Sequence, residues 1–185
     1  MRLYLVRHAA VTVRPDRPPA DWHLSPEGRA GAAALADESC WANVSRLCTS
    51  PEPKAVATAQ RIAARHGLPI VIERDLREID GRTWTEPARH RELVRRYLGG
   101  EAVDAWEPRA AALDRMRSCI DAIGQRHAGE DAAAVSHGLV LTLWLTDLLG
   151  LDVAASRELS TRMRFPDLAI VDRVERRVER DFGGG

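Results

Sequence analysis

The stretch Leu3-Tyr4-Leu5-Val6-Arg7-His8 places four strand-forming apolar residues directly before two basic residues. A short, continuous apolar run of this kind is typical of a β-strand that is covered on both faces. Similar runs recur at residues 46–49, 69–73 and 131–135, with segments of helical character between them. Strands that alternate with helices of ten or more residues predict an α/β domain with a largely parallel sheet.

Capping residues indicate where the helices begin and end. Ser25 is suited to an N-cap and Pro26 to the first helical position, while Gly67 is suited to a helix C-terminus. We expect a loop over residues 75–86 and one or two strands within residues 168–182. The helices are predicted at residues 26–39, 52–66, 87–98, 108–127 and 138–149.

Composition and length limit the class of protein. The 185 residues include 27 basic (Lys and Arg) and 27 acidic side chains, and 45% of the residues are hydrophobic. These values exclude a disordered chain, which is poor in apolar residues and carries a high net charge. They also argue against a general nucleic-acid binder, which needs an excess of basic residues on one face. The length predicts a single domain over residues 1–182, followed by a flexible tail over residues 183–185.

The N-terminus and the cysteines predict a cytoplasmic protein. The first apolar run is too short for a secretory signal, and the chain contains no stretch of about 18 apolar residues. Cys40, Cys48 and Cys119 match neither the spacing of a zinc site nor that of a disulfide framework, so we expect three buried, free thiols. We expect no membrane and no nucleic-acid partner, and the sequence is compatible with a homodimer.

The chemistry is expected at the carboxyl ends of the strands, where open α/β sheets bind their ligands. Arg7 and His8 follow the first predicted strand, and Lys54 lies one helical turn beyond the second. Glu78 follows the third strand and His137 the fourth. Two histidines, two cations and a carboxylate on one rim suit the handling of an anion, especially a phosphoryl group.

Phosphoryl transfer has a use for each of these residue types. The reaction spreads negative charge over three equatorial oxygens, which the fork of Arg7 and the point charge of Lys54 can stabilise. A neutral histidine attacks phosphorus in line when a carbonyl group fixes its other ring nitrogen as N–H. A carboxylic acid can protonate the leaving oxygen. The first turn of the helix that begins at Gly138 is expected to offer backbone N–H groups as a further anion site.

Four motifs, taken in order, resemble the histidine phosphatase (phosphoglycerate-mutase-like) superfamily. Each motif alone is weak, but the order and spacing of all four over residues 3–138 are specific. The resemblance implies a phosphoglycerate-mutase-like fold, a three-layer α/β/α sandwich with a mostly parallel central sheet. The motifs are Leu5-Val6-Arg7-His8, then Ser50-Pro51-Glu52-Pro53-Lys54-Ala55-Val56-Ala57-Thr58-Ala59, then Leu76-Arg77-Glu78, then Ser136-His137-Gly138.

The same resemblance implies a role for each residue. His8 is the expected nucleophile, which becomes phosphohistidine, while Arg7 and His137 hold the phosphoryl oxygens. Glu78 is expected to protonate the leaving alcohol and then to activate water. Lys54 stands at the position of the superfamily's second phosphate-binding arginine. Because the superfamily uses no metal, we expect neither a metal nor another cofactor.

The sequence departs from the superfamily pattern at three places. Ala9 replaces the usual glycine, which is acceptable if the local φ is negative. Lys54 supplies one flexible charge instead of a fork, which predicts slower phosphoryl stabilisation and a higher kcat/KM in Lys54→Arg if this charge limits the rate. The loop after Glu78 is one residue short, so Asp80 is an alternative acid.

The leading hypothesis is a metal-independent phosphatase that hydrolyses a phosphomonoester of a small molecule through His8. A phosphoglycerate-type mutase is one alternative, although such mutases are longer chains. A phosphate-binding protein with little or no turnover is the other alternative, because of Lys54. The loops at residues 14–22 and 83–106 are expected to select the leaving group. Four further histidines lack any motif and are predicted to be structural or exposed: His23, His66, His90 and His127.

Overall fold

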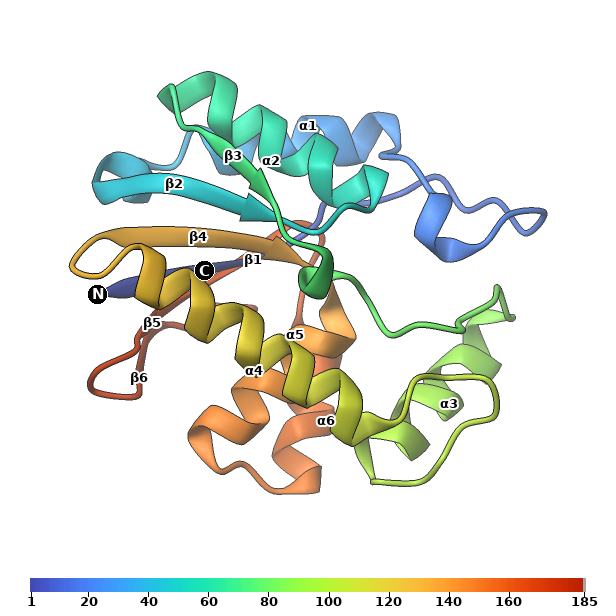
Figure 1. The fold of residues 1–185 in the computed structure, drawn as a ribbon. Helices are drawn as coiled ribbons and strands as arrows, with labels where there is room; N and C mark the ends of the chain where they lie inside the picture. Colours follow the sequence, from blue (N-terminus) through green and yellow to red (C-terminus); the bar gives the residue numbers. More distant parts are fainter. Residues whose placement is uncertain (185) are drawn as a thin grey trace.

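The computed structural model describes residues 1–184, and its centre is one six-stranded sheet (Figure 1). The strands are β1 (Arg2–Arg7), β2 (Val44–Thr49), β3 (Ile70–Ile72), β4 (Asp131–Ser136), β5 (Asp167–Asp172) and β6 (Arg177–Arg180). Their order across the sheet is β3-β2-β4-β1-β5-β6. β3, β2, β4 and β1 are mutually parallel, whereas β5 is antiparallel to β1 and β6 is antiparallel to β5. The predicted mostly parallel sheet is therefore confirmed, with an antiparallel pair at one edge.

Helices cover both faces of this sheet. They are α1 (Pro26–Ala36), α2 (Pro53–His66), α3 (Pro87–Leu98), α4 (Arg109–Arg126), α5 (Gly138–Leu149) and α6 (Val153–Arg162). α1 and α2 lie on one face, whereas α4 and α5 lie on the other (Figure 1). This arrangement confirms the three-layer α/β/α sandwich.

The first strand shows why its apolar run has no polar interruption. Leu3 and Leu5 belong to the hydrophobic cluster that includes residues of α4 and α5. Tyr4 and Val6 belong to the cluster that includes residues of α1 and α2. All four side chains are buried. Because successive side chains of a strand point to opposite faces, a strand between two helical layers needs an apolar residue at every position.

The start of α1 is held against the segment that leaves β1. The Ser25 side chain accepts a hydrogen bond from the Gly28 N–H (3.0 Å), which confirms the predicted N-cap. The Ala10 carbonyl accepts a hydrogen bond from the Ser25 N–H (3.0 Å). A Cβ atom on Gly28 would lie 1.9 Å from that carbonyl oxygen, so only glycine permits this close approach.

Two parts of the fold differ from the sequence-based expectation. The helix predicted to residue 39 ends at Ala36, and a short 3₁₀ helix, η2 (Ser39–Asn43), leads into β2. α6 was not predicted at all. Its sequence, Val-Ala-Ala-Ser-Arg-Glu-Leu-Ser-Thr-Arg, buries only Ser156 and Leu159, so its apolar pattern is weak. Its clearest local signal is Asp152, which caps the helix by accepting a hydrogen bond from the Ala155 N–H (2.8 Å).

The predicted C-terminal tail is described only up to residue 184. The Gly183 N–H donates to Asp167 (2.9 Å), and residue 185 of the predicted tail lies outside the described residues.

Cys48 and Cys119 are buried and Cys40 is half-buried, and all three are free thiols within residues 1–184. In the same part of the chain, no helix combines the length and the apolar character that crossing a membrane requires.

Candidate active site

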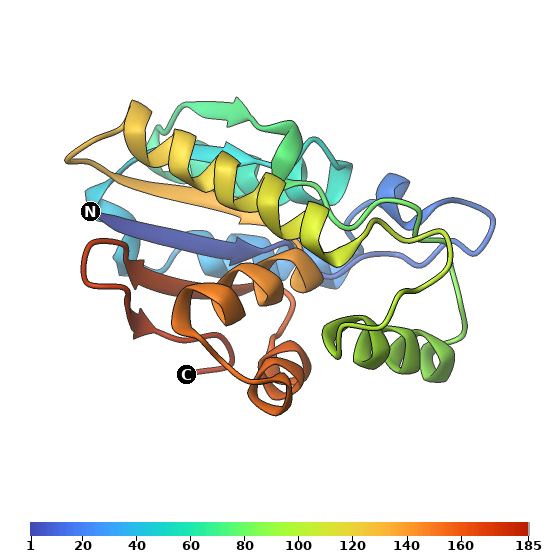
Figure 2. The same ribbon diagram turned by 60° about the horizontal axis from the view of Figure 1, so that its bottom comes forward.

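The parallel strands end at one edge of the sheet, and the predicted site residues meet there. The loop at residues 14–22 and helix α3 both project past this edge (Figure 2). A cavity of about 700 Å³ opens between them. Five of its lining residues are those predicted from the sequence: Arg7, His8, Lys54, Glu78 and His137.

His8 is buried at the end of β1, and its ring is fixed by its own backbone neighbour. The Nδ1 atom lies 2.8 Å from the Ala9 carbonyl oxygen. Because a carbonyl oxygen only accepts hydrogen bonds, Nδ1 carries the proton and Nε2 has a free lone pair. Burial, followed by the charge of Lys54, holds the pKa of His8 well below its usual value. A neutral imidazole with a free Nε2 is what a nucleophilic histidine requires.

His137 faces His8 from the N-terminus of α5. The two ring centroids are 5.1 Å apart. The Nε2 atom of His137 is 2.8 Å from the Ser50 hydroxyl oxygen, and its Nδ1 has no hydrogen-bond partner among the described residues. Burial, followed by the proximity of His8, holds the pKa of His137 well below its usual value. One ring nitrogen of His137 is therefore without a protein partner among the described residues.

Arg7 lies under the same cavity and is held by the segment that follows α6. Its Nη1 donates to the Met163 carbonyl (2.6 Å), and its Cζ lies 3.4 Å from the centroid of the Phe165 ring. Its Nε is buried without a hydrogen-bond partner among the described residues. A Cβ on Gly138 would come within 3.0 Å of the guanidinium, so the glycine of the Ser-His-Gly motif makes room for Arg7. Burial lowers the pKa of Arg7 to about 10, so the group stays charged at neutral pH.

Lys54 reaches the cavity from the first turn of α2. Its ammonium group donates to the Pro19 carbonyl (2.8 Å) and forms an ion pair with Glu52. Both side chains of this pair are buried, with 6% and 10% of their surface exposed. The sequence placed Lys54 at the site, but the buried carboxylate beside it was not predicted.

The Glu78 carboxylate lies across the start of α5. It accepts hydrogen bonds from the backbone N–H groups of Leu139 (3.2 Å) and Val140 (3.1 Å). It also forms an ion pair with Arg82 (2.9 Å). The first-turn N–H groups of this helix were expected to bind a ligand anion, and here they bind the protein's own carboxylate instead.

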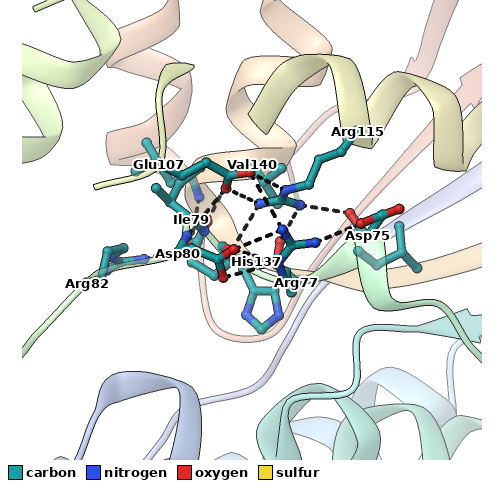
Figure 3. Close-up of polar contacts among 12 residues, drawn as sticks. Asp75, Arg77, Ile79, Asp80, Arg82, Glu107, Arg115, His137 and Val140 are labelled. Atoms are coloured by element: carbon teal, nitrogen blue, oxygen red, sulfur yellow. Dashed lines mark hydrogen bonds and ion pairs between the residues drawn. The ribbon is translucent and has the colours of Figure 1, made fainter. Parts of the chain in front are cut away.

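Arg115 of α4 holds the backbone of the loop that carries Glu78 (Figure 3). The Arg115 guanidinium donates to the carbonyl groups of Asp75 (2.8 Å), Arg77 (3.0 Å) and Glu78 (3.0 Å). It also forms an ion pair with Glu107 (2.7 Å), and only 10% of each of these two side chains is exposed. One buried guanidinium therefore sets the path of the backbone that presents Glu78.

Asp80 was the alternative acid, and its surroundings do not favour that role. Its carboxylate accepts three hydrogen bonds from the Arg77 side chain, at 2.8 to 3.1 Å. The Asp80 side chain is 59% exposed, whereas the Glu78 side chain is 13% exposed. Glu78 is the better placed carboxylate for chemistry inside the cavity.

Comparison with known proteins gives the family. The sequence model of the histidine phosphatase superfamily (branch 1) matches residues 3–176. This chain belongs to that superfamily. It is 34% identical over 140 residues to the uncharacterized protein Rv0525 of Mycobacterium tuberculosis, an alignment covering 68% of this chain and 67% of the relative. It is 29% identical over 185 residues to the probable phosphoglycerate mutase GpmB of Yersinia enterocolitica, covering 93% and 85%.

Solved structures share the fold over essentially the whole chain. YhfR of Bacillus stearothermophilus is 21% identical with a TM-score of 0.79, covering 100% of this chain and 97% of the other. The mycobacterial glucosyl-3-phosphoglycerate phosphatase Rv2419c in complex with inorganic phosphate is 21% identical with a TM-score of 0.77 and the same coverage. Phosphoserine phosphatase from Entamoeba histolytica is 17% identical with a TM-score of 0.77, covering 98% and 96%. The expected phosphoglycerate-mutase-like fold is confirmed.

The departure from the superfamily pattern at Ala9 causes no backbone strain. Within residues 1–184, the residues other than glycine with positive φ are Ala105 and Arg176. Ala9 is fully buried, and its N–H donates to the Thr58 hydroxyl (3.0 Å). The condition set for an alanine at this position is therefore met.

In this histidine phosphatase superfamily member, several cavity residues escaped the sequence analysis. His90 was predicted to be structural or exposed, but it lines the cavity with its Nε2 3.3 Å from Arg82. Burial and the charge of Arg82 lower its pKa to about 4. Glu52 lies inside a motif that had been recognised, so its position could have signalled it. Phe165 also lines the cavity, and Met163 accepts a hydrogen bond from Arg7; neither residue lies in a motif.

The rest of the cavity wall is largely apolar. Trp22, from the loop at residues 14–22, is part of this wall. Among residues 1–184, no group of three or more His, Cys, Asp or Glu side chains is arranged to hold a metal ion. The apolar wall residues are Ala10, Val11, Val13, Pro18, Pro19, Ala20, Trp22, Ile79 and Phe165.

Proposed function

We propose that this protein hydrolyses a small phosphomonoester without a metal ion, through a phosphohistidine intermediate on His8. The observation that carries the proposal is the pair of buried rings, His8 and His137, 5.1 Å apart in one cavity. Arg7, Lys54 and Glu78 line the same cavity. This set provides a nucleophile, charge-stabilising groups and a proton carrier around the space for one phosphoryl group.

In the first step, His8 Nε2 attacks phosphorus and the bond from phosphorus to the alcohol oxygen breaks. Glu78 gives a proton to that oxygen, and the alcohol leaves. The N–H at Nδ1 of His8, held by the Ala9 carbonyl, stabilises the positively charged phosphohistidine ring. Arg7 and Lys54 balance the charge of the equatorial oxygens, and the neutral His137 contributes a hydrogen bond to one of them.

In the second step, Glu78 takes a proton from a water molecule that attacks phosphorus. The bond between His8 and phosphorus breaks, and inorganic phosphate leaves. The apolar wall around Trp22 contacts the alcohol part of the substrate, which is a surface for leaving-group selection. Relatives of the same fold support a small phosphorylated substrate, since their names include glucosyl-3-phosphoglycerate phosphatase and phosphoserine phosphatase.

The test is phosphate release from p-nitrophenyl phosphate in the presence of EDTA. We expect turnover by the wild type, loss of at least about a thousandfold in kcat/KM for His8→Ala, and little change for the exposed His23→Ala. Rapid quenching is expected to trap acid-labile phosphate on the wild type but not on His8→Ala. Turnover that persists in His8→Ala would contradict the proposed nucleophile.

A binding protein without turnover remains the second candidate, and one observation favours it. The two cations of the site already have protein partners, because Lys54 is paired with Glu52 and Arg7 donates to Met163. If the wild type binds vanadate or phosphate but releases no product over long incubation, this candidate replaces the phosphatase.

The mutase alternative rests on the relatives named as probable phosphoglycerate mutases. A mutase returns the phosphoryl group to the same carbon skeleton, whereas a phosphatase gives it to water. Incubation with 3-phosphoglycerate separates the two. We expect free phosphate as the product, and accumulation of 2-phosphoglycerate would favour the mutase.

A further inference from the structure

Position 54 is unusual for this chain because it carries the only lysine in the whole sequence. The other 26 of the 27 basic residues are arginine. This single lysine lies in the cavity with 6% of its side chain exposed, and Glu52, with 10% exposed, forms an ion pair with it. A chain that uses arginine at every other basic position has an ammonium group at the one place where a phosphoryl group is expected.

Glu52 is held in place by three different elements. Its Oε2 pairs with Lys54 of α2, and its Oε1 accepts from the Glu78 N–H (2.7 Å). Glu78 lies on the loop between β3 and α3, which we call the acid loop. His137 Nε2, at the start of α5, lies 3.3 Å from the same Oε1. These are the charged and titratable groups that face Glu52, together with the Glu78 carboxylate, whose charge also acts on it. Even without Lys54, the Glu78 N–H and His137 hold Oε1, so the carboxylate has little freedom to swing away.

A dianionic ligand in this cavity meets a carboxylate in the wall. Two like charges that lie close together in a partly buried site repel each other far more strongly than they do in water. Because Glu52 cannot easily move, the repulsion is relieved most directly by adding a proton to it. Burial already raises the pKa of Glu52 above its usual value, against the opposing effect of Lys54.

We propose that Glu52 takes up one proton from solvent when a phosphoryl group enters the site. The proton binds Oε2, the ion pair between Glu52 and Lys54 breaks, and the ammonium group turns to the anion. Oε1 keeps its hydrogen bond from the Glu78 N–H, so the acid loop stays in place. Glu52 is thus a positioning residue that couples phosphate binding to protonation. The inference rests on the proposed function, because it requires the anion to bind between His8 and Lys54.

The choice of lysine fits this exchange. An arginine would hold the carboxylate with two parallel hydrogen bonds and resist separation. An ammonium group offers three donors on a flexible chain, so it can keep the Pro19 carbonyl while exchanging Glu52 for the ligand.

The experiment uses sulfate, a dianion that does not itself titrate near neutral pH. Calorimetry of sulfate binding in buffers with different ionisation enthalpies measures proton uptake directly. We expect wild-type uptake to exceed that of Glu52→Gln by close to one proton. Wherever binding is accompanied by proton uptake, the sulfate affinity of the wild type should fall as the pH rises. The fall should be steeper than that of Glu52→Gln by up to about tenfold per pH unit. Glutamine is a neutral isostere of the protonated acid, and Glu158→Gln, at an exposed position of α6, is the control of equal charge change.

Two measurements on the wild type keep the result clear if Glu52→Gln folds poorly. In protein labelled with ¹⁵N-lysine, the single lysine gives one side-chain signal, which reports whether sulfate reaches Lys54. Infrared difference spectra then show whether a carboxylate band is replaced by the C=O band of a protonated acid. Equal proton uptake in wild type and Glu52→Gln, or no new acid band, would overturn this inference and leave the phosphate pocket intact. A lysine signal that sulfate does not move would contradict the pocket itself, and with it the inference.

Discussion

At the scale of single residues, the effect of Lys54→Arg on kcat/KM depends on Glu52, which forms an ion pair with Lys54. From the sequence alone, Lys54→Arg is expected to raise kcat/KM by restoring a fork. The structure adds a buried carboxylate that can accept both arms of that fork. The substituted guanidinium would then be engaged by Glu52 rather than by the phosphoryl group.

We therefore expect Lys54→Arg alone to give no more than a twofold gain in kcat/KM at pH 8. The double variant Lys54→Arg/Glu52→Gln should gain about fivefold over Glu52→Gln, because the fork is then free for the ligand. Steady-state kinetics of the four proteins form a double-mutant cycle that measures this coupling. Additive effects in the cycle would mean that Glu52 and position 54 act independently.

At the scale of elements, the site depends on how α4 holds the loop between β3 and α3. Arg115 satisfies the carbonyl groups of Asp75, Arg77 and Glu78, and it neutralises Glu107. Without Arg115, Glu107 keeps only the more distant ion pair with Arg77 (3.7 Å) among the described residues, and three carbonyl groups lose their donor. The position of Glu78 is thus set by a residue that does not touch the cavity.

Arg115→Met is expected to lower the free energy of unfolding by about 3 kcal/mol and to reduce kcat more than it raises KM. Arg117→Met, on the same helix, is the matched control. Arg117 pairs with Asp147 at a site where 43% of the arginine side chain is exposed, so its loss should change stability by less than about 1 kcal/mol. Urea unfolding and phosphatase kinetics measure both effects, and equal losses in the two variants would contradict this role of Arg115.

At the scale of the whole molecule, two buried neutral histidines link stability to pH. The folded state holds the pKa of both His8 and His137 well below the usual value, mainly through burial. As the pH falls, the unfolded chain therefore binds protons at a higher pH than the folded protein does. The free energy of unfolding consequently decreases below about pH 6.5. Glu52 acts in the opposite sense, because its carboxyl pKa is raised by burial, but one carboxyl opposes two histidines.

Urea unfolding between pH 7 and pH 5 should show a falling free energy of unfolding. Each histidine that stays neutral in the folded state removes about 1.4 kcal/mol per pH unit below its unfolded pKa. His137→Gln should show a shallower slope than the wild type over this interval. A flat profile, or stability that increases toward pH 5, would contradict the neutral buried pair.

Part of the fold and of the site could be predicted because the signals are local. The apolar run before Arg7 and His8 identifies a strand with two buried faces, and its end identifies the site edge. Ser25 and Gly67 mark helix ends, and the structure has the Ser25 cap and a left-handed Gly67. Helix α6 was not predicted because its apolar face is narrow and the Ser, Thr and Arg residues of the segment obscure the helical pattern.

The sequence by itself determined the layers, the strands that carry the site, and the placement of Arg7, His8, Lys54, Glu78 and His137. Only the tertiary structure decided what surrounds them. Arg7 meets Met163 across 156 positions of the chain, and Arg115 meets Asp75 across 40. Likewise, only the folded chain shows that the N–H groups at the start of α5 bind Glu78. The physical reason is that capping and side-chain periodicity act between near neighbours. The partners of a buried charge are instead set by which elements the packed core brings together.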